Sequence, residues 1–389
     1  MSLRASQRSD CILQSEIRNM SIECDQVGGI NLSQGVCDLE VPEQVRRAAR
    51  EAIEDGFNSY TRYDGLASLR RALACKLERA GLSADPETEI TVSAGATGAL
   101  YCAALALLDP GDEVILFEPY YGYHLSTLQA TGVVPAYVKL RPPDWDFDPG
   151  ELAAACTPRT RGIVVCTPAN PCGKVFTRQE LETIRDLASD RELFVFTDEI
   201  YEYLVYDGRE HLPPALVPGM AERTVTISGL SKTFSITGWR IGYSFCPADL
   251  ARAIGYFNDL VYVCAPAPLQ EGVARGLQAL PASFYEELRE GYARKRDRIC
   301  TALDRAGLVP CVPQGAYYVL ADISRLPGAN SKERAMNLLR DSGVACVPGS
   351  AFYHNPSDGD DLARFCFAKS DSDLEQGCNR LEARKAHAR

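Results

Sequence analysis

Histidine, tryptophan and methionine are scarce in this sequence, with four, two and four copies in 389 residues. The histidines, His124, His211, His354 and His387, are far apart and follow no ligand spacing. A structural zinc site needs ligands in short, regular intervals. We therefore expect no metal site.

Long apolar runs and basic clusters are also missing. No apolar stretch approaches the length needed to cross a bilayer, and the first eight residues have no apolar core of the kind a signal peptide carries. The chain has 41 basic and 52 acidic residues, a formal charge of −11, and no Lys/Arg run that could follow a phosphate backbone. A cytoplasmic location is expected, and nucleic acid is an improbable partner.

Cysteine is plentiful, yet the usual cysteine motifs are absent. The fifteen copies are an odd number, include no Cys-x-x-Cys, and several stand inside apolar runs such as Val164-Val165-Cys166. Most are expected to be reduced, buried and small hydrophobic residues. The length, with 46% hydrophobic and 24% charged residues, suits a globular enzyme of two or three domains.

Short apolar runs alternate with helical patterns through the middle of the chain. This alternation predicts a mostly parallel sheet wrapped by helices, with the ligand site at the carboxyl ends of its strands. Helices are expected at Pro42–Asp55, Leu66–Ala80 and Thr177–Asp190. The expected strands are Glu113–Phe117, Val133–Val138, Gly162–Cys166, Leu193–Thr197, Thr224–Ile227 and Ile241–Cys246.

The pattern changes after Pro281, where one long charged helical segment, Ser283–Ala306, leads into shorter strands and helices. A smaller α+β domain is predicted there. The expected organisation is residues 1–41 as an N-terminal arm and part of the small domain, 42–282 as a large α/β domain, and 283–389 as the small domain. The arm has weak periodicity, which is typical of a lid or a tether.

Residues 228–242 contain the most suggestive chemistry. Lys232 stands among small residues, and Arg240 follows eight positions later. A lysine near a second cation loses its proton more easily, and an arginine offers a fork of donors to a phosphate. The two side chains suit a phosphorylated aldehyde, namely pyridoxal phosphate. A solvated surface lysine is the alternative.

Asp198 closes the apolar run 193–197, so its carboxylate belongs at a strand's carboxyl end. There it could pair with a protonated pyridine nitrogen, which makes the ring an electron sink. A helix cap or a salt bridge explains the residue equally well. Tyr201, three residues later, could reach the same ring.

Three further segments could surround such a ring. Asn170 lies in a rigid turn with two prolines and can donate to a phenolate oxygen, although ordinary turn chemistry also explains it. Gly95 and Thr97 precede a helix expected over Ala99–Leu108 and could form an anion cradle, or simply a helix cap. Tyr121 could stack on a flat cofactor or belong to the packed core.

Taken together, these residues resemble the class I and II pyridoxal-phosphate aminotransferases of fold type I, over essentially the whole chain. Asn31-Leu32-Ser33-Gln34-Gly35 is similar to the family's N-terminal glycine segment, and Tyr60 with Gly65 to a helix start at which the tyrosine reaches a neighbouring subunit's phosphate. Arg364 is similar to the arginine that holds the substrate α-carboxylate, through a bidentate contact.

The resemblance implies a role for each residue. Lys232 would form the internal aldimine and move the proton, Asp198 would keep the ring nitrogen protonated, and Tyr201 and Asn170 would bind the phenolic oxygen. Tyr121 would stack on the ring, while Gly35, Asn170 and Arg364 would line the substrate pocket. The phosphate would be held by Gly95, Ala96, Thr97, Ser231, Arg240 and a second subunit's Tyr60, which requires a homodimer.

Two departures from the family pattern bear on the site. Gly229 stands where some relatives have a serine that touches the phosphate. Acid-specific relatives read a distal carboxylate with an added cation, whereas this chain has Thr97 in the phosphate loop and no arginine in residues 259–266. A neutral or aromatic amino acid is therefore favoured, unless Arg18 or Arg62 reaches the pocket.

Amino-group transfer between an L-amino acid and a 2-oxo acid is the leading hypothesis. A carbon–sulfur β-lyase, a γ-eliminase or a cyclising enzyme on the same fold is the alternative, because all share the lysine. A non-catalytic sensor domain is disfavoured, since the segment before the first motif is too short and too weakly basic to bind DNA.

Overall fold

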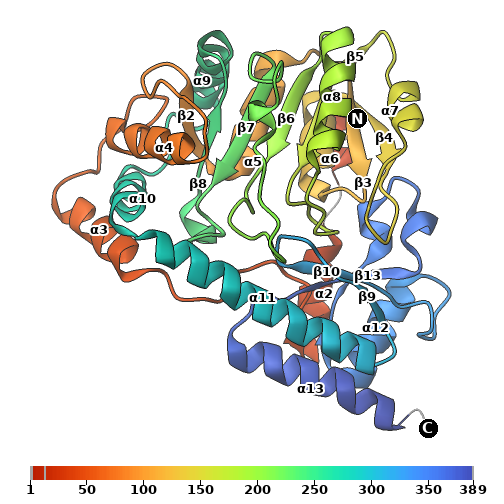
Figure 1. Cartoon of the computed structure of the whole chain (residues 1–389). Helices are drawn as coiled ribbons and strands as arrows, with labels where there is room; N and C mark the ends of the chain where they lie inside the picture. Colours follow the sequence, from red (N-terminus) through yellow and green to blue (C-terminus); the bar gives the residue numbers. More distant parts are fainter. Residues whose placement is uncertain (1–2, 13–14, 388–389) are drawn as a thin grey trace.

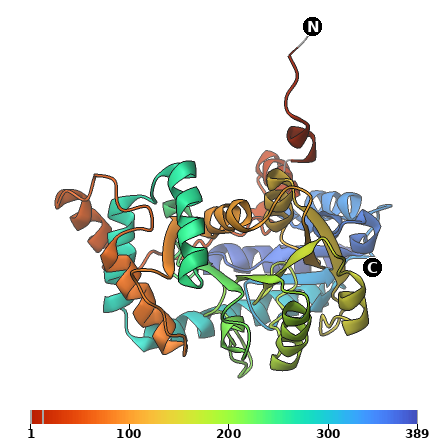
Figure 2. The same ribbon diagram turned by 90° about the horizontal axis from the view of Figure 1, so that it is seen from above.

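The computed structural model describes residues 3–12 and 15–387. Figure 1 shows a large sheet flanked by helices, with a smaller group of strands and helices beneath it that is built from both ends of the chain. In Figure 2, the first described residues extend away from the body of the molecule. None of the described helices is long and apolar enough to cross a membrane.

The large sheet has seven strands in the order β2-β8-β7-β6-β5-β3-β4. All neighbours are parallel except β8, which runs antiparallel to both β2 and β7. The predicted α/β class with a mostly parallel sheet is confirmed. The strands are β2 (Ile90–Ala94), β3 (Glu113–Glu118), β4 (Val134–Lys139), β5 (Thr160–Cys166), β6 (Phe194–Asp198), β7 (Thr224–Gly229) and β8 (Ile241–Phe245).

Helices cover both faces of this sheet, and the alternation of side chains along each strand decides which face each residue joins. Ile115 and Val195 pack with helix α8 (Arg178–Asp190) on one face. Val114 and Phe196, one residue away on the same strands, pack on the other face with α5 (Gly95–Leu107), α6 (Gly122–Thr131) and α9 (Ala248–Tyr262). Near the β2 edge lie α3 (Glu43–Glu54), α4 (Ala67–Arg79) and α10 (Ala267–Ala279), while α7 (Pro149–Ala154) precedes β5.

Two local predictions were wrong. No strand was expected at β2, because the polar Thr91 and Ser93 interrupt its short apolar run, although both are buried here. Helix α5 begins at Gly95, not at Ala99. Ala96 and Thr97 are therefore in the first turn of the helix, where backbone N–H groups have no partner within the helix.

The smaller group is organised around a four-stranded sheet, β12-β13-β10-β9. Its strands are β9 (Val309–Cys311), β10 (Tyr318–Asp322), β12 (Val347–Pro348) and β13 (Leu362–Cys366). The long helix α11 (Ala282–Arg305) leads into it from the large sheet, and α12 (Ser331–Ser342) and α13 (Asp371–His387) complete it. The Asn330 side chain caps α12, and Gly343 ends that helix with a left-handed φ of 68°.

The N-terminal arm is more ordered than its sequence suggested. It contains two helices, α1 (Gln7–Cys11) and α2 (Glu16–Gln26), and α2 buries Met20 and Cys24 in the core of the small group. Strand β1 (Ile30–Asn31) then pairs with β11 (Val344–Ala345) in a parallel two-stranded sheet. The domain boundaries after residues 41 and 282 stay predictions.

Cysteines occupy the positions that their apolar surroundings indicated. Fourteen of the fifteen belong to the part of the chain whose side chains are described, all fourteen are free, and nine of them are buried. Burial raises the pKa of several of these thiols, for example that of Cys172 to about 12. They therefore behave as small hydrophobic residues.

Candidate active site

A cavity of about 560 Å³ opens where β5, β6 and β7 end, between the start of α5 and the α2 arm. This is the edge at which a parallel sheet presents ligand groups. Its walls bring together nine of the expected site residues: Ala96, Thr97, Tyr121, Asn170, Asp198, Tyr201, Ser231, Lys232 and Arg240. Gly95, Gly35 and Arg364 lie directly behind the lining, and Tyr60 does not belong to it.

Lys232 lies in the loop that joins β7 to β8. Its Nζ donates to the Gly35 carbonyl oxygen at 3.3 Å and lies 5.5 Å from the centre of the Tyr317 ring. The loop is anchored by the buried side chains of Phe234 and Ile236, whose backbone N–H groups donate to residues 230 and 231. Burial lowers the pKa of Lys232 below its usual value, an effect that Asp198 opposes and Arg240 strengthens, so this amine loses its proton more easily than an ordinary lysine.

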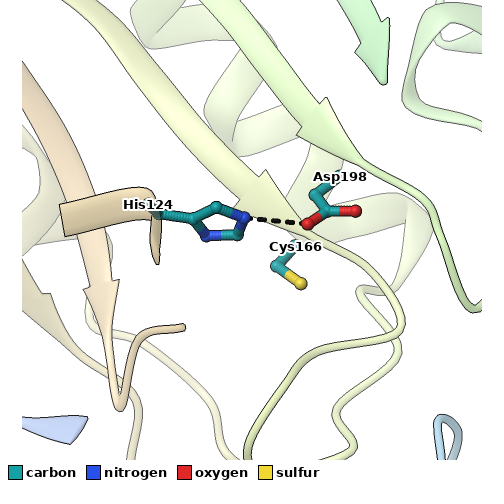
Figure 3. Close-up of side chains that lie close together, drawn as sticks. All are labelled: His124, Cys166 and Asp198. Carbon is teal, nitrogen blue, oxygen red and sulfur yellow. Dashed lines mark hydrogen bonds and ion pairs between the residues drawn. The ribbon is translucent and has the colours of Figure 1, made fainter. Parts of the chain in front are cut away.

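Asp198 closes β6 and points toward the first turn of α6 (Figure 3). Its Oδ2 lies 2.8 Å from Nε2 of His124, and its Oδ1 accepts from the Ile200 N–H at 3.2 Å. The sequence offered no signal for this partner, because His124 is 74 residues away along the chain. His124 is buried, so its ring holds the carboxylate in one orientation.

Cys166 lies beside this pair, and the three side chains are close enough to share a metal ion (Figure 3). The chemistry argues against that use. Burial raises the pKa of the Cys166 thiol well above its usual value, and the thiol donates to the Pro168 carbonyl oxygen at 3.6 Å. A protonated thiol is a poor ligand, and the histidine and aspartate already bind each other.

Aromatic and amide groups close the cavity around Asp198. Tyr121 precedes α6 and meets the His124 ring edge-on, with ring centres 5.2 Å apart. Tyr201 is buried, its hydroxyl is 3.4 Å from that of Tyr318, and burial raises its pKa, so it remains a neutral donor. The Asn170 Oδ1 accepts from Nη1 of Arg364 at 2.9 Å.

The start of α5 and the Arg240 side chain form an anion cradle. Gly95 has a φ of +76°, and a Cβ there would lie 2.4 Å from Nη2 of Arg240. Gly242 on β8 approaches so closely that a Cβ on it would lie 2.3 Å from the Gly95 carbonyl carbon and 2.4 Å from the Ala96 nitrogen. The exposed Arg240 guanidinium donates to the Thr237 carbonyl oxygen, and no carboxylate of the described residues pairs with it. Its charge faces the free N–H groups of the helix start.

Close backbone packing explains why residue 229 is a glycine and not a serine. It pairs with Gly242 across β7 and β8, and a Cβ there would lie 2.9 Å from the Ile241 carbonyl oxygen. The preceding Ser228 does not replace the missing hydroxyl, because its Oγ donates to Glu202. Ser231, which lines the cavity, is the available hydroxyl.

Arg364 on β13 is completely buried next to the cavity. Its Nη2 donates to the Ser33 carbonyl oxygen at 2.7 Å, and its Cζ lies 4.1 Å from the centre of the Tyr318 ring. Its Nε has no hydrogen-bond partner among the described residues. A buried guanidinium with an unused N–H suits an incoming carboxylate.

Gly35 and Tyr60 occupy different environments. A Cβ on Gly35 would lie 1.8 Å from the Tyr318 hydroxyl oxygen, so no side chain fits there, and the Gly35 carbonyl oxygen accepts from both Lys232 and Tyr317. The Tyr60 side chain is 84% exposed and reaches no cavity residue of its own chain. Its predicted role depends on a second copy.

Comparisons with known proteins agree on one family. A profile of the aminotransferase class I and II family matches residues 27–381. Kynurenine–oxoglutarate transaminase 3 of Mus musculus is 36% identical over 378 residues, which cover 89% of this chain and 82% of that protein. A probable N-succinyldiaminopimelate aminotransferase of Mycobacterium tuberculosis is 38% identical over 374 residues, which cover 93% and 94% of the two chains.

Solved structures give the same answer. N-succinyldiaminopimelate aminotransferase from Mycobacterium tuberculosis superimposes with a TM-score of 0.94 at 36% identity, covering 98% of this chain and 100% of that one. A protein from Escherichia coli described with a methionine aminotransferase function also has a TM-score of 0.94, at 32% identity and with 98% and 100% coverage. Both similarities extend over the large sheet and the smaller group.

Proposed function

The chain belongs to the class I and II aminotransferases, and from that premise we propose which of its residues carry the reaction and which amino donors it accepts. It is a pyridoxal-phosphate-dependent aminotransferase, and its substrates are an amino acid and a 2-oxo acid. When bound, pyridoxal phosphate supplies an aldehyde that condenses with amines and a ring that accepts electron density from the substrate.

Lys232 is the proposed covalent anchor and the proton carrier of the reaction. The observation that supports this role is its position: a lysine with a lowered pKa lies in the same cavity as Asp198 and Arg240. An amine with a lowered pKa loses its proton more readily and can attack a carbonyl. Once released, Lys232 would take the proton from the substrate α-carbon and deliver it to the former aldehyde carbon of the cofactor.

Asp198 is proposed to face the ring nitrogen, with His124 holding its carboxylate in place. A fixed carboxylate favours the protonated nitrogen, which strengthens the ring as an electron sink. Tyr201 and Asn170 supply polar hydrogens for the phenolic oxygen, and Tyr121 lies against the ring face.

The phosphate fits the cradle at the start of α5. Gly95, Ala96 and Thr97 offer helix-start N–H groups and a hydroxyl, and Ser231 and Arg240 complete the site. Arg240 is free to take this anion, because it has no carboxylate partner among the residues that the structure describes. Tyr60 of a second copy is proposed as the remaining ligand, which makes the enzyme a homodimer.

Arg364, Asn170 and Gly35 are proposed to hold the substrate α-carboxylate. The unused Nε–H of Arg364 supports this role, and Asn170 already bonds to the same guanidinium. Arg364 is completely buried, and its guanidinium is held in place by the Ser33 carbonyl oxygen and by Asn170.

A neutral or aromatic L-amino acid is the proposed donor. Val36, Tyr121 and Tyr123 give the cavity an apolar wall. Of the two arginines that could read an acidic side chain, Arg62 is held by Asp64 and also pairs with Glu87 at 3.4 Å, whereas Arg18 lines the cavity. The relative from Mus musculus is named for an aromatic donor, kynurenine.

The proposal is tested by mixing the holoenzyme with each of the twenty amino acids in the absence of an acceptor. We expect neutral and aromatic amino acids to convert one equivalent of cofactor and then stop. Continued release of ammonia and a 2-oxo acid would instead identify a lyase. Borohydride reduction followed by peptide mass spectrometry should find the cofactor on the Lys232 peptide, and attachment elsewhere would overturn the assignment.

A further inference from the structure

One cation of the cavity has no role in the chemistry proposed above. Among the described residues, two arginines and one lysine line the cavity: Arg18, Arg240 and Lys232. Lys232 is assigned to the reacting carbon and Arg240 to the phosphate, whereas Arg18 comes from helix α2 of the N-terminal arm. Its position requires a separate explanation.

Arg18 is available to bind a ligand. Its side chain is exposed, and within residues 3–12 and 15–387 no carboxylate pairs with it. Arg62 differs in this respect, because Asp64 and Glu87 occupy its guanidinium. Arg18 is therefore the cavity cation whose charge is neither paired nor claimed by the cofactor.

The arm holds Arg18 at the cavity by packing on the small sheet. Met20 and Cys24 are buried in that core, and Ile17 packs against the cluster that contains Val347. Glu16 pairs with Lys332 at 3.0 Å and ties the start of α2 to α12. Because residues 17, 20 and 24 share one helix face, Arg18 is left on a different side, where it joins the cavity lining.

The assigned groups determine which part of a substrate meets Arg18. The α-carboxylate is assigned to Arg364 and the reacting carbon to Lys232, so the substrate side chain takes the rest of the cavity, whose lining includes Val36, Tyr123 and Arg18. An apolar side chain can pack against Val36 and Tyr123. An acidic one can reach past them to the guanidinium.

We propose that Arg18 is a specificity-determining residue that binds the distal carboxylate of a dicarboxylic 2-oxo acid. This inference rests on the proposed aminotransferase function. Donor and acceptor use the same cavity in turn, so a wall of apolar residues beside a free arginine lets one pocket accept a neutral donor and a dicarboxylic acceptor. An arginine suits this task because its long, flexible stem lets the guanidinium bind the distal carboxylate of one substrate and remain in water when the other substrate has none.

The test compares two acceptors in the holoenzyme with one saturating neutral donor. In Arg18→Met, the KM for 2-oxoglutarate should rise about twofold to fivefold, the range of one exposed ion pair. The KM for 2-oxobutyrate, which lacks the distal carboxylate, should not change. Arg18→Lys should restore part of the affinity for 2-oxoglutarate. The KM for L-glutamate as donor should rise in Arg18→Met as the KM for 2-oxoglutarate does.

Two controls keep the result specific. Arg289→Met removes an exposed arginine of α11 that does not line the cavity, so it should leave both KM values unchanged. Glutarate should lose affinity for Arg18→Met in an inhibition assay, while butyrate should not. Equal changes for both acceptors, or the same changes in Arg289→Met, would overturn the role of Arg18. Failure of every amino acid to convert the wild-type cofactor would overturn the proposed function instead.

Discussion

At the scale of single residues, the lowered pKa of Lys232 links its chemistry to the stability of the chain. An ordinary lysine titrates near 10.5, and burial lowers that value in the folded chain. Between the two pKa values the unfolded chain binds one more proton than the folded chain. The free energy of unfolding must then rise with pH across that window.

We expect Lys232→Met to remove this dependence in the cofactor-free protein. The variant should be more stable than the wild type at neutral pH, because the wild type must keep an amine buried that water would protonate. The gap should narrow as pH approaches 10.5. Thermal unfolding of both cofactor-free proteins between pH 7 and 10 measures this difference in stability. If the stabilities of the two proteins changed with pH in parallel, the expectation would be wrong.

His124 is a positioning residue whose removal can be measured without turnover. His124→Phe leaves Oδ2 of Asp198 without its partner in a buried site, so the free energy of unfolding should fall by about 1–3 kcal/mol. The activity–pH profile should also change, because the carboxylate is no longer fixed. His124→Asn retains a hydrogen-bond donor and should recover part of both effects. If the stability and the activity–pH profile of His124→Phe equalled those of the wild type, the positioning role would be excluded.

The sequence predicted the residues of the site better than it predicted their partners. Lys232, Asp198 and Asn170 each follow an apolar run, and the carboxyl ends of parallel strands meet at one edge, so their convergence could be foreseen. His124 lies inside a helix 74 residues from Asp198, and no local sequence pattern predicts a contact between residues so far apart. The bond from Arg364 to the Ser33 carbonyl oxygen, 331 residues away along the chain, was likewise not predictable.

At the scale of elements, the contact between β8 and the start of α5 positions the anion cradle. Gly242→Ala would force a Cβ against the backbone of Gly95 and Ala96. Overpacking of this kind usually costs about 1–3 kcal/mol. The displaced helix start should weaken pyridoxal phosphate binding by about tenfold or more, as measured by equilibrium dialysis.

Gly238→Ala is the matched control for this prediction. It lies four residues before Gly242, in the loop that leads into β8, yet a Cβ there meets no atom within 4 Å. Its cofactor affinity should equal that of the wild type. Equal losses in the two variants would mean that the loop tolerates no change at all and that the contact of Gly242 with α5 has no special importance.

Element types were predictable wherever apolar periodicity was strong. The strands β3 to β8 lie within three residues of the expected positions, because most of them are nearly continuous buried runs. The edge strand β4 is only partly buried. Strand β2 was missed, since its Thr91 and Ser93 make it look polar, and α5 starts earlier than its apolar pattern does. Helix α2 owes its order to packing on the small sheet, which a sequence pattern of low periodicity does not show.

At the scale of the whole molecule, Tyr60 belongs to an exposed set of apolar residues that favours a second copy as partner. Tyr60 is 84% exposed, and Leu260 is 78% exposed near the end of α9. Tyr256, Val261 and Val263 are also more than two-fifths exposed. The Tyr63 and Tyr256 rings, with centres 5.8 Å apart, bring the Tyr60 segment to α9. Large apolar side chains exposed close together are typical of an interface.

Hybrid dimers test the exchange of Tyr60 between copies. Lys232→Ala should be inactive, and Tyr60→Phe should bind the cofactor about tenfold more weakly, because a charge-assisted hydrogen bond is lost. A hybrid of the two variants has one site with both native residues, Lys232 from one copy and Tyr60 from the other. Activity at low cofactor concentration should therefore reappear when the variants are co-expressed and the hybrid is purified. If the hybrid is no better than Tyr60→Phe, the tyrosine acts within its own chain or not at all.

The contact between Gly95 and Gly242 also has an evolutionary consequence. A Cβ on Gly242 would meet the backbone of Gly95 and Ala96, and a Cβ on Gly95 would meet the Arg240 guanidinium, so neither glycine can be replaced without disturbing the anion cradle. Arg18 is under no such restraint, because it stands on a helix surface where other side chains fit. Related enzymes should therefore differ in substrate specificity while retaining the same cofactor-binding residues.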